Sequence, residues 1–281
     1  NIKNKEIYIG KRIIIENFII ITGKDKYNLI QRFLENKNHK KYVQNQLGLP
    51  TDKPTKKVLD FIGRESEKKY IVKPVHGFAG IGIFRVKNKE ELLRKYSKIK
   101  RRKRDNWVIQ EYIDDPMLYE KHKFHIRSYY IITSKGDIYL SNTSYIKLAK
   151  KEYIKDNYND DDIHDTHDPK KYIIFSDSNH QGFTDKQYKH MKKEMIKLHK
   201  LLASKLDITC YKETELCYHI LGPDIMFTSS GDIKLLELNV RPMMDDYIFN
   251  YLFEGVMQEI VDKKFPPLIK QKKNNNLTRL S

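Results

Sequence analysis

Apolar side chains recur at every third or fourth position between residues 183 and 206, and this spacing predicts the clearest helix of the chain. Thr184 and Gln187 have the sequence of a capping box at its start. Phe183 and Tyr188 occupy the positions of a hydrophobic staple. The apolar stripe consists of Tyr188, Met191, Met195, Leu198 and Leu202. We therefore expect this helix to pack one face against the core.

Shorter apolar runs predict further strands and helices. A strand at 18–22 precedes a helix at 26–35, and residues 48–50 and 53–54 mark a linker or a sheet edge. The later predicted elements are a strand, glycine-rich turn and strand at 70–86, a helix at 90–98, strands at 107–112, 123–133 and 137–140, a strand pair at 217–227 and 233–238, and a helix at 247–261.

Three polar segments interrupt these elements. Residues 100–105 form a basic run and predict a solvated loop, 151–170 predict a mobile loop, and 270–281 predict a disordered tail. The mixture of helices with hairpin-connected strands predicts an α+β enzyme built from antiparallel sheets.

The charge balance is strongly basic, with 54 Lys plus Arg against 37 Asp plus Glu and a net charge of +17. This excess favours an acidic partner, such as a nucleic acid, an anionic membrane face, an acidic peptide or a nucleotide. Lysine is abundant throughout the chain, so charge alone does not choose among them. The 281 residues suffice for one large domain or two to three small ones.

The cysteine count and the hydropathy bear on the compartment in which the protein is expected. Cys210 and Cys217 are too few for a disulfide scaffold or a four-cysteine metal site. No apolar run approaches the roughly 20 residues that a spanning helix needs, and residues 1–5 do not start a signal peptide. We expect a soluble cytoplasmic protein with reduced cysteines and no membrane partner.

A glycine-rich turn follows the strand that carries Lys73. Gly77, Gly80 and Gly82 lie within six positions, and glycines let backbone N–H groups approach phosphate oxygens. Lys73 would add a positive charge for the same phosphates. The turn is not a Walker A loop, because no Gly-Lys-Ser/Thr ends it. An ordinary flexible hairpin is the alternative.

A possible metal site lies on the predicted strand pair near the carboxyl end. Alternation places Glu237 and Asn239 on one face of their strand, with Leu236 and Leu238 on the other. A hairpin turn at 228–232 brings Asp224 opposite Glu237 to within about one register step. Two carboxylates and an amide oxygen suit Mg²⁺. Solvated edge residues are the alternative.

Cationic side chains alternate along the strand that begins at Lys123. Lys123, His125 and Arg127 share one face, while Phe124 and Ile126 pack behind. Two cations and a histidine on one sheet face form an anion site. A solvated strand face is the competing interpretation.

Taken in order, these motifs resemble the tubulin–tyrosine ligase-like domain, a branch of the ATP-grasp ligases. The resemblance covers residues 70–242 and is weaker before them. The residues that carry it are Lys73-Pro74 with the glycine turn, Gln110-Glu111-Tyr112-Ile113, Lys123-Phe124-His125-Ile126-Arg127, Gly222-Pro223-Asp224-Ile225-Met226, and Leu236-Glu237-Leu238-Asn239-Val240-Arg241-Pro242.

The resemblance implies an ATP-grasp fold in which the nucleotide is held between a central and a carboxyl-terminal domain. It places a pre-ATP-grasp-like α/β segment, which we expect to be incomplete, at 1–60, the central subdomain at 61–115, the carboxyl-terminal subdomain with the Mg²⁺ site at 116–269, and the tail at 270–281. It also implies an ATP- and Mg²⁺-dependent ligase that joins an amino acid to an acidic protein or peptide through an acyl phosphate, as in tyrosination or glutamylation.

The implied roles follow the motifs. Nucleotide binding falls to Lys73, Gly77, Gly80, Gly82, Lys123, His125 and the hinge residues Gln110, Glu111, Tyr112 and Ile113. One or two Mg²⁺ ions are bound by Asp224, Glu237 and Asn239. The reaction is served by Lys123, Arg127, Lys147 and Arg241. An upstream lysine is also implied, for which Lys40 and Lys41 are candidates.

Three departures from the family pattern bear on the function. His125 stands where the family has Asp, Arg241 intervenes before Pro242, and His164-Asp165-Thr166-His167 only echoes the His-Leu-Thr-Asn of tubulin modifiers. They leave the acceptor open, and His125 keeps a nucleotide-binding pseudoenzyme or scaffold as one alternative. A basic nucleic-acid-binding protein is a second alternative, based on the net charge of +17, the basic run at 101–104 and the 19 tyrosines, although no recognised nucleic-acid motif is present.

Overall fold

The computed structural model describes most of the chain. The described residues are 19–22, 26–50, 53–63, 68–75, 80–98, 107–133, 135–166, 172–210, 218–240, 242–256, 259 and 275–280. The predicted basic loop at 100–105 and the site residues Gly77 and Arg241 lie outside this part. None of the described helices is long and apolar enough to cross a membrane.

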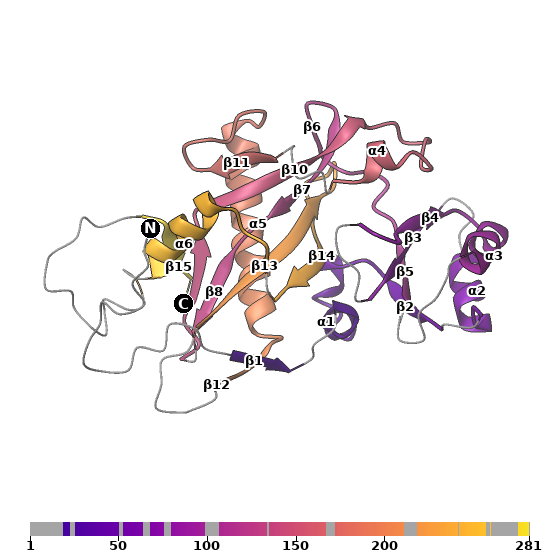
Figure 1. The fold of residues 1–281 in the computed structure, drawn as a ribbon, viewed down its shortest axis with the longest axis horizontal. Coiled ribbons are helices and arrows are strands. Elements are labelled where there is room, and N and C mark those ends of the chain that lie inside the picture. Colours follow the sequence, from indigo (N-terminus) through magenta and orange to yellow (C-terminus); the bar gives the residue numbers. More distant parts are fainter. Residues whose placement is uncertain are drawn as a thin grey trace, which may run out of the picture.

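A nine-stranded antiparallel sheet forms the larger half of the molecule (Figure 1). Its main path runs β11-β10-β7-β13-β8-β9-β15, with β14 paired to β13 and β6 paired to β7. The strands are β6 Leu118–Tyr119, β7 His122–Arg127, β8 Tyr130–Thr133, β9 Ile138–Ser141, β10 Thr143–Glu152, β11 Tyr172–Ser176, β13 Tyr218–Phe227, β14 Ile233–Asn239 and β15 Leu277–Arg279.

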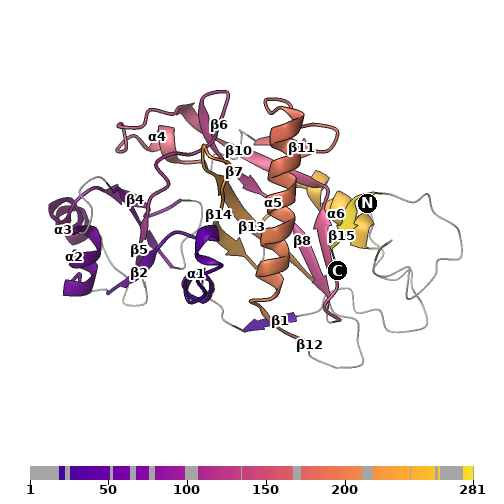
Figure 2. The ribbon, with the colours of Figure 1, turned by 180° about the vertical axis from the view of Figure 1, so that it is seen from behind.

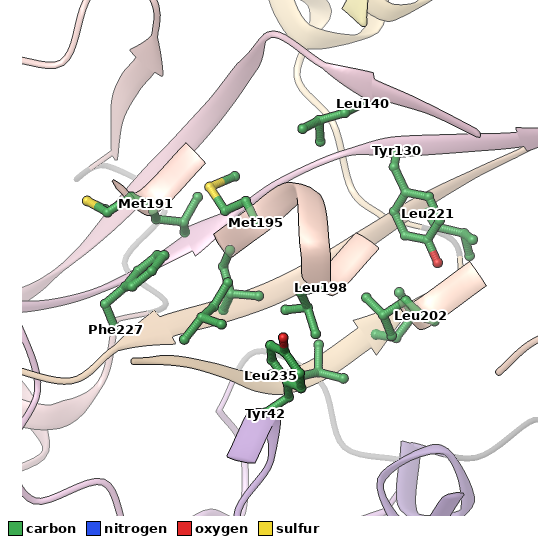
Figure 3. Close-up of a cluster of buried hydrophobic side chains, with 14 of the residues drawn as sticks. Tyr42, Tyr130, Leu140, Met191, Met195, Leu198, Leu202, Leu221, Phe227 and Leu235 are labelled. Carbon is green, nitrogen blue, oxygen red and sulfur yellow. The ribbon is translucent and has the colours of Figure 1, made fainter. Parts of the chain in front are cut away.

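Helix α5, Asp185–Ala203, covers one face of this sheet (Figure 2). Thr184 caps it, and the predicted capping box with Gln187 is confirmed. The predicted stripe from Tyr188 to Leu202 is buried against strand residues such as Leu221 and Leu235 (Figure 3). Helix α1, Lys26–Leu34, and the 3-10 helix η1, Lys40–Tyr42, complete this core.

The opposite face is covered at one end by helix α6, Asp246–Val256. Its buried residues Ile248, Leu252 and Val256 pack on Tyr129 and Tyr145 of the sheet region. A second, smaller sheet lies beside the end of the large sheet that is away from α6 (Figure 1). Lys123 and Asp224 of the large sheet line a cleft together with residues of the second sheet.

The second sheet has four antiparallel strands in the order β2-β5-β3-β4. They are β2 Gln46–Leu49, β3 Tyr70–Pro74, β4 Phe84–Val86 and β5 Trp107–Glu111. Helices α2, Lys56–Gly63, and α3, Lys89–Ser97, contribute to a separate core on one of its faces. A further strand pair joins β1, Ile19–Thr22, to β12, Asp207–Cys210.

The long strand predicted at 123–133 is interrupted into β7 and β8. Both pair with β13 in one continuous register, since Arg127 lies opposite Asp224 and Tyr130 opposite Leu221. The ladder of backbone hydrogen bonds is interrupted opposite Pro223, because proline has no N–H to donate. The Ser128 N–H still donates to the Pro223 carbonyl. The prediction of one unbroken strand was therefore wrong, because residues 128 and 129 separate β7 from β8.

The mobile loop predicted at 151–170 and the disordered tail predicted at 270–281 are both wrong for the described residues, whereas 167–170, 270–274 and 281 lie outside the described part. The segment 151–170 continues β10 to Glu152 and contains helix α4, Asp161–His164, with Ile163 and His164 buried. In the predicted tail, β15 pairs with β9, because Leu277 is buried in the core beneath α6. Residues 48–49 belong to β2 at a sheet edge, which confirms one of the two interpretations offered for them.

The remaining predicted elements match closely. The described part of the carboxyl-terminal helix ends at Val256, whereas the sequence predicted it to 261. The α+β class with antiparallel sheets is confirmed. The predicted domain boundaries stay a prediction, and β2, from the segment predicted as amino-terminal, joins the small sheet.

Removing the Leu198 side chain tests the core beneath α5. Leu198 is fully buried, so we expect Leu198→Ala to lower the free energy of unfolding by about 2–5 kcal/mol. Lys193→Ala, on the exposed side of the same helix, should change it by less than about 0.5 kcal/mol. Urea titration followed by circular dichroism gives both values. Equal values for the two variants would contradict this assignment of the core.

Candidate active site

A cleft between the two sheets collects most of the predicted site residues. Its lining combines the glycine turn, the hinge that follows β5, and the large sheet. The predicted residues that line it are Lys73, Gly80, Gln110, Glu111, Tyr112, Ile113, Lys123, His125, Asp224 and Glu237. Arg127 and Asn239 contact Asp224 behind this surface.

The small sheet forms one wall of the cleft. Strand alternation turns Ile71, Lys73 and Arg85 toward the cleft, while Val72 and Val86 enter the core on the other face. Lys73 Nζ donates to the backbone carbonyl of Leu236 at 3.3 Å. The two walls are therefore in direct contact at the predicted phosphate-binding lysine.

The glycine turn has a backbone that other residues rarely adopt. Gly80 and Gly82 have φ values of 71° and 81°, in the left-handed region that favours glycine. A Cβ at Gly82 would also lie 3.3 Å from the Trp107 ring. This turn requires glycine at both positions, and Gly80 lies on the cleft surface.

Asp224 and Arg127 form a buried ion pair on adjacent strands. They lie opposite each other in the β7–β13 ladder, and Asp224 is 2% exposed. Arg127 donates from Nε to Oδ1 and from Nη2 to Oδ2, the latter at 2.8 Å. Burial works against the charge of Arg127, yet the Asp224 carboxylate raises its pKa above the ordinary value. The carboxylate charge is thus balanced within the protein.

The three predicted metal ligands meet around this pair. Asp224 lies opposite Glu237, and Gly222 opposite Asn239, in the β13–β14 ladder. Asn239 Nδ2 donates to Asp224 Oδ2 at 3.3 Å and to the Gly222 carbonyl at 3.1 Å. Two carboxylates and an amide fit Mg²⁺, which completes its shell with water and phosphate oxygens. Among the described residues, His, Cys, Asp and Glu form no cluster of three that could hold a metal by itself.

A β-bulge changes which leucine faces the cleft. Asp224 pairs with Glu237, but Ile225 pairs with Leu235, so Leu236 is the extra residue. Leu236 lines the cleft beside Glu237, and Leu235 takes its place in the core. The predicted placement of Leu236 behind the strand was wrong, because strict alternation cannot account for an inserted residue.

Lys123 lies in a buried polar group at the hinge end of the cleft. Its Nζ donates to the Tyr112 hydroxyl and lies 4.1 Å from the centroid of the same ring. Burial, assisted by the positive charge of Arg85, lowers the pKa of Lys123 to about 7. A modest change in its surroundings can therefore change its charge at neutral pH.

The segment predicted as a mobile loop supplies residues that the site prediction missed. His164 and Thr166 line the cleft together with Asp161 and Asp165. The Thr166 hydroxyl forms a hydrogen bond with His125 Nδ1. The other ring nitrogen of His125, Nε2, lies 3.6 Å from Asp224 Oδ1. The signal in the sequence was the echo of His-Leu-Thr-Asn at 164–167. Arg85 also lines the cleft and was missed, and no motif marks it.

The remaining candidates lie around the cleft. Lys147 sits beside His125 in the β7–β10 ladder and is half-buried. Burial, followed by the nearby Arg127 charge, lowers its pKa. Lys40 and Lys41 are exposed, and neither lines the cleft. Neither lysine therefore lies where the expected upstream lysine would contact a nucleotide in the cleft. Gly82 supports the turn from beside the cleft.

Two antiparallel sheets that enclose a cleft with a glycine turn, a hinge and paired carboxylates define an α+β protein with an ATP-grasp-like fold. The model of the tubulin-tyrosine ligase family matches residues 2–203. The chain belongs to this family, whose members are protein-modifying ligases.

Relatives of two kinds were found. The chain is 31% identical to a tubulin polyglutamylase of Homo sapiens over 96 residues, 34% of this chain and 10% of the relative. It is 25% identical to a probable tubulin–tyrosine ligase of Schizosaccharomyces pombe over 201 residues, 62% of this chain and 46% of the relative. These matches thus span less than half of either relative's length.

Breaking the buried ion pair should destabilise the fold. Arg127→Leu leaves the Asp224 charge buried, so we expect a loss of about 3–5 kcal/mol in the free energy of unfolding. Arg279→Leu, which breaks the exposed pair with Asp137, should cost less than about 1 kcal/mol. Adding Asp224→Asn to Arg127→Leu should recover part of the loss. Denaturant titration measures all three, and a double variant no more stable than Arg127→Leu would argue against charge burial as the cause.

Proposed function

We propose that this chain is an ATP- and Mg²⁺-dependent carboxylate–amine ligase that joins an amino acid to an acidic protein or peptide. The observation that carries the proposal is the meeting, in one cleft, of Lys73 and the glycine turn with Asp224 and Glu237. A nucleotide polyanion needs both the cationic wall and a metal-binding wall, because either alone leaves charge unbalanced.

The nucleotide would lie between the two sheets. Gly77, Gly80 and Gly82 would present backbone N–H groups to the phosphates, with Lys73 beside them. The backbone of the hinge, Gln110 to Ile113, would read the adenine. Ile71, Met226 and Leu236 line the same cleft and would contact the base with apolar surface. His125 and Lys123 would bind the nucleotide from the large sheet.

Asp224, Glu237 and Asn239 would hold one or two Mg²⁺ ions. Bound there, the metal supplies positive charge that balances the phosphate oxygens. Arg127 already balances Asp224 in the protein, so Glu237 is the carboxylate on the cleft surface with the clearest role in metal affinity.

The proposed reaction has two steps. A substrate carboxylate oxygen attacks the γ-phosphorus of ATP and displaces ADP, which gives an acyl phosphate. An amine nitrogen then attacks the acyl carbon, and phosphate leaves as the amide bond forms. Lys123, Arg127 and Lys147 would stabilise the negative charge that is transferred. Arg241 is proposed to assist in the same role. No enzyme nucleophile is required.

Protein acceptors are the substrate class that the relatives suggest. One relative is named a tubulin polyglutamylase and another a probable tubulin–tyrosine ligase. A net charge of +17 would steer an acidic, tubulin-like tail toward the cleft. A cytoplasmic setting with ATP, reduced cysteines and such acceptors is part of this proposal.

Calorimetric titration of a non-hydrolysable ATP analogue tests the nucleotide and metal site. Wild-type protein should bind the analogue more tightly with Mg²⁺, and Glu237→Gln should lose at least tenfold of that gain, about 1.4 kcal/mol. Glu194→Gln, on the opposite side of the large sheet in α5, is the matched control and should bind as wild type does. No binding by wild-type protein would exclude the ligase function and make the basic surface the leading functional feature.

His125 motivates the pseudoenzyme alternative, since the family pattern has Asp at this position. The side chain is 1% exposed and bonds Thr166 within the cleft, which supports a site built around histidine. We therefore expect His125→Asp to lower the rate of ADP release with amino acid and acidic peptide present. His122→Asp, on the same strand outside the cleft lining, controls for added charge. A higher rate in His125→Asp would instead identify the histidine as the cause of impaired catalysis.

A further inference from the structure

A chain of hydrogen bonds connects Lys123 to the backbone of the β10–β11 connection. Lys123 Nζ donates to the Tyr112 hydroxyl, the hydroxyl lies 2.7 Å from His164 Nδ1, and His164 Nε2 lies 2.8 Å from the Asn157 carbonyl. Lys123, Tyr112 and His164 all line the cleft. None of the proposed reaction steps uses Tyr112 or His164 as a side chain.

The donor and the acceptor of each of these hydrogen bonds can be assigned, starting from the Asn157 carbonyl. A carbonyl oxygen only accepts, so His164 Nε2 carries a proton and donates to Asn157. Burial, followed by the nearby charge of Lys123, lowers the pKa of His164 to about 4, so the ring is neutral near pH 7. Nδ1 is then an acceptor, and the Tyr112 hydroxyl donates to it. The phenol oxygen consequently presents its lone pairs to Lys123.

We propose that Tyr112 and His164 are positioning residues that hold Lys123 as an ammonium directed into the nucleotide cleft. A hydrogen bond to the charged form of an amine favours that form. Without the phenol oxygen, a buried Lys123 beside Arg85 would lose its proton more readily. These hydrogen bonds, which we call the relay, thus raise the proportion of Lys123 that carries a positive charge, which burial alone would lower further.

The anchor of the relay is itself fixed to the small sheet. Asn157 is followed by Tyr158, whose hydroxyl donates to both oxygens of Glu91 in α3 at 3.0 and 2.9 Å. The Tyr158 carbonyl accepts from Arg85 Nε. The β10–β11 connection therefore joins the two walls of the cleft, and the position of Lys123 depends on both.

Other charged groups also act on Lys123. Arg85 from β4 lowers its pKa, and Asp114 after the hinge raises it. His164 faces it through Tyr112, and His125 lies two residues along its own strand. These groups are unchanged in Tyr112→Phe, which removes one oxygen atom. Tyr153→Phe is the matched control, because its hydroxyl donates to the Asp114 carbonyl and its ring lies beside His164.

The proton of Lys123 can be followed directly in nucleotide-free protein by NMR of its Cε, assigned from the signal lost in Lys123→Met. We expect a titration midpoint near 7 in the wild type and a midpoint about one pH unit lower in Tyr112→Phe. His164→Phe should shift it in the same direction. Tyr153→Phe should leave it within about 0.3 pH units. An unchanged midpoint in folded Tyr112→Phe would overturn the relay.

Nucleotide binding gives a second readout, and this part rests on the proposed function. The affinity for Mg²⁺-ADP should be measured from pH 6 to 9. Above pH 7 the phosphate itself no longer titrates, so a change in affinity there reports on the protein. We expect Tyr112→Phe to bind about tenfold more weakly than wild type at pH 8 and only about twofold more weakly at pH 6. An equal loss at all pH values would indicate a merely structural role and overturn the proposal. If the wild type bound no nucleotide while the NMR shift was present, the proposed function would fail and the relay would stand.

Discussion

Burial of charge is the constraint on which this cleft depends. Arg127 and Asp224 are both removed from water in the middle of the large sheet, where an unpaired ion would cost several kcal/mol. Their bidentate pairing is possible because β7 and β13 place them directly opposite each other. Asn239 and His125 add contacts to the same carboxylate. The site therefore holds its charges in position before any ligand enters.

The two sheets divide the work of the site between them. The small sheet contributes Lys73 and the glycine turn, whereas the large sheet contributes Lys123 and the carboxylates. Each sheet has one face packed against its own helices. Polar residues of both sheets can therefore line the cleft between them. The contact from Lys73 to the Leu236 carbonyl joins them at the bulge in β14. Backbone irregularity and function coincide here, as is common for bulges near active sites.

The connection between β10 and β11 shows how a polar segment becomes ordered. Its sequence is rich in aspartate and would stay solvated as an isolated peptide. In the folded chain, Tyr158 enters a buried contact with Glu91, and Arg85 pairs with Asp161. These partners lie 67 and 76 residues earlier. The order of this segment is thus a property of two sheets brought together.

Local patterns in the sequence were sufficient for the elements whose causes are local. The capping box of Thr184 and the 3–4 spacing of the α5 stripe depend on neighbouring residues, as do the glycine turn and the alternation of Lys123, His125 and Arg127. The opposition of Asp224 and Glu237 followed from one hairpin turn. For these features, secondary structure alone determines which side chains share a face.

Tertiary structure decided the rest, because the causes lie far apart in the chain. The extra residue at Leu236, the pairing of β15 with β9 and the entry of His164 into the cleft each depend on surfaces built by distant segments. The periodicity of the sequence does not predict these features, because a bulge, an edge strand and a docked loop depend on the surfaces against which they pack. The sequence determined the chemical groups of this site, and only the folded chain determined which of them meet.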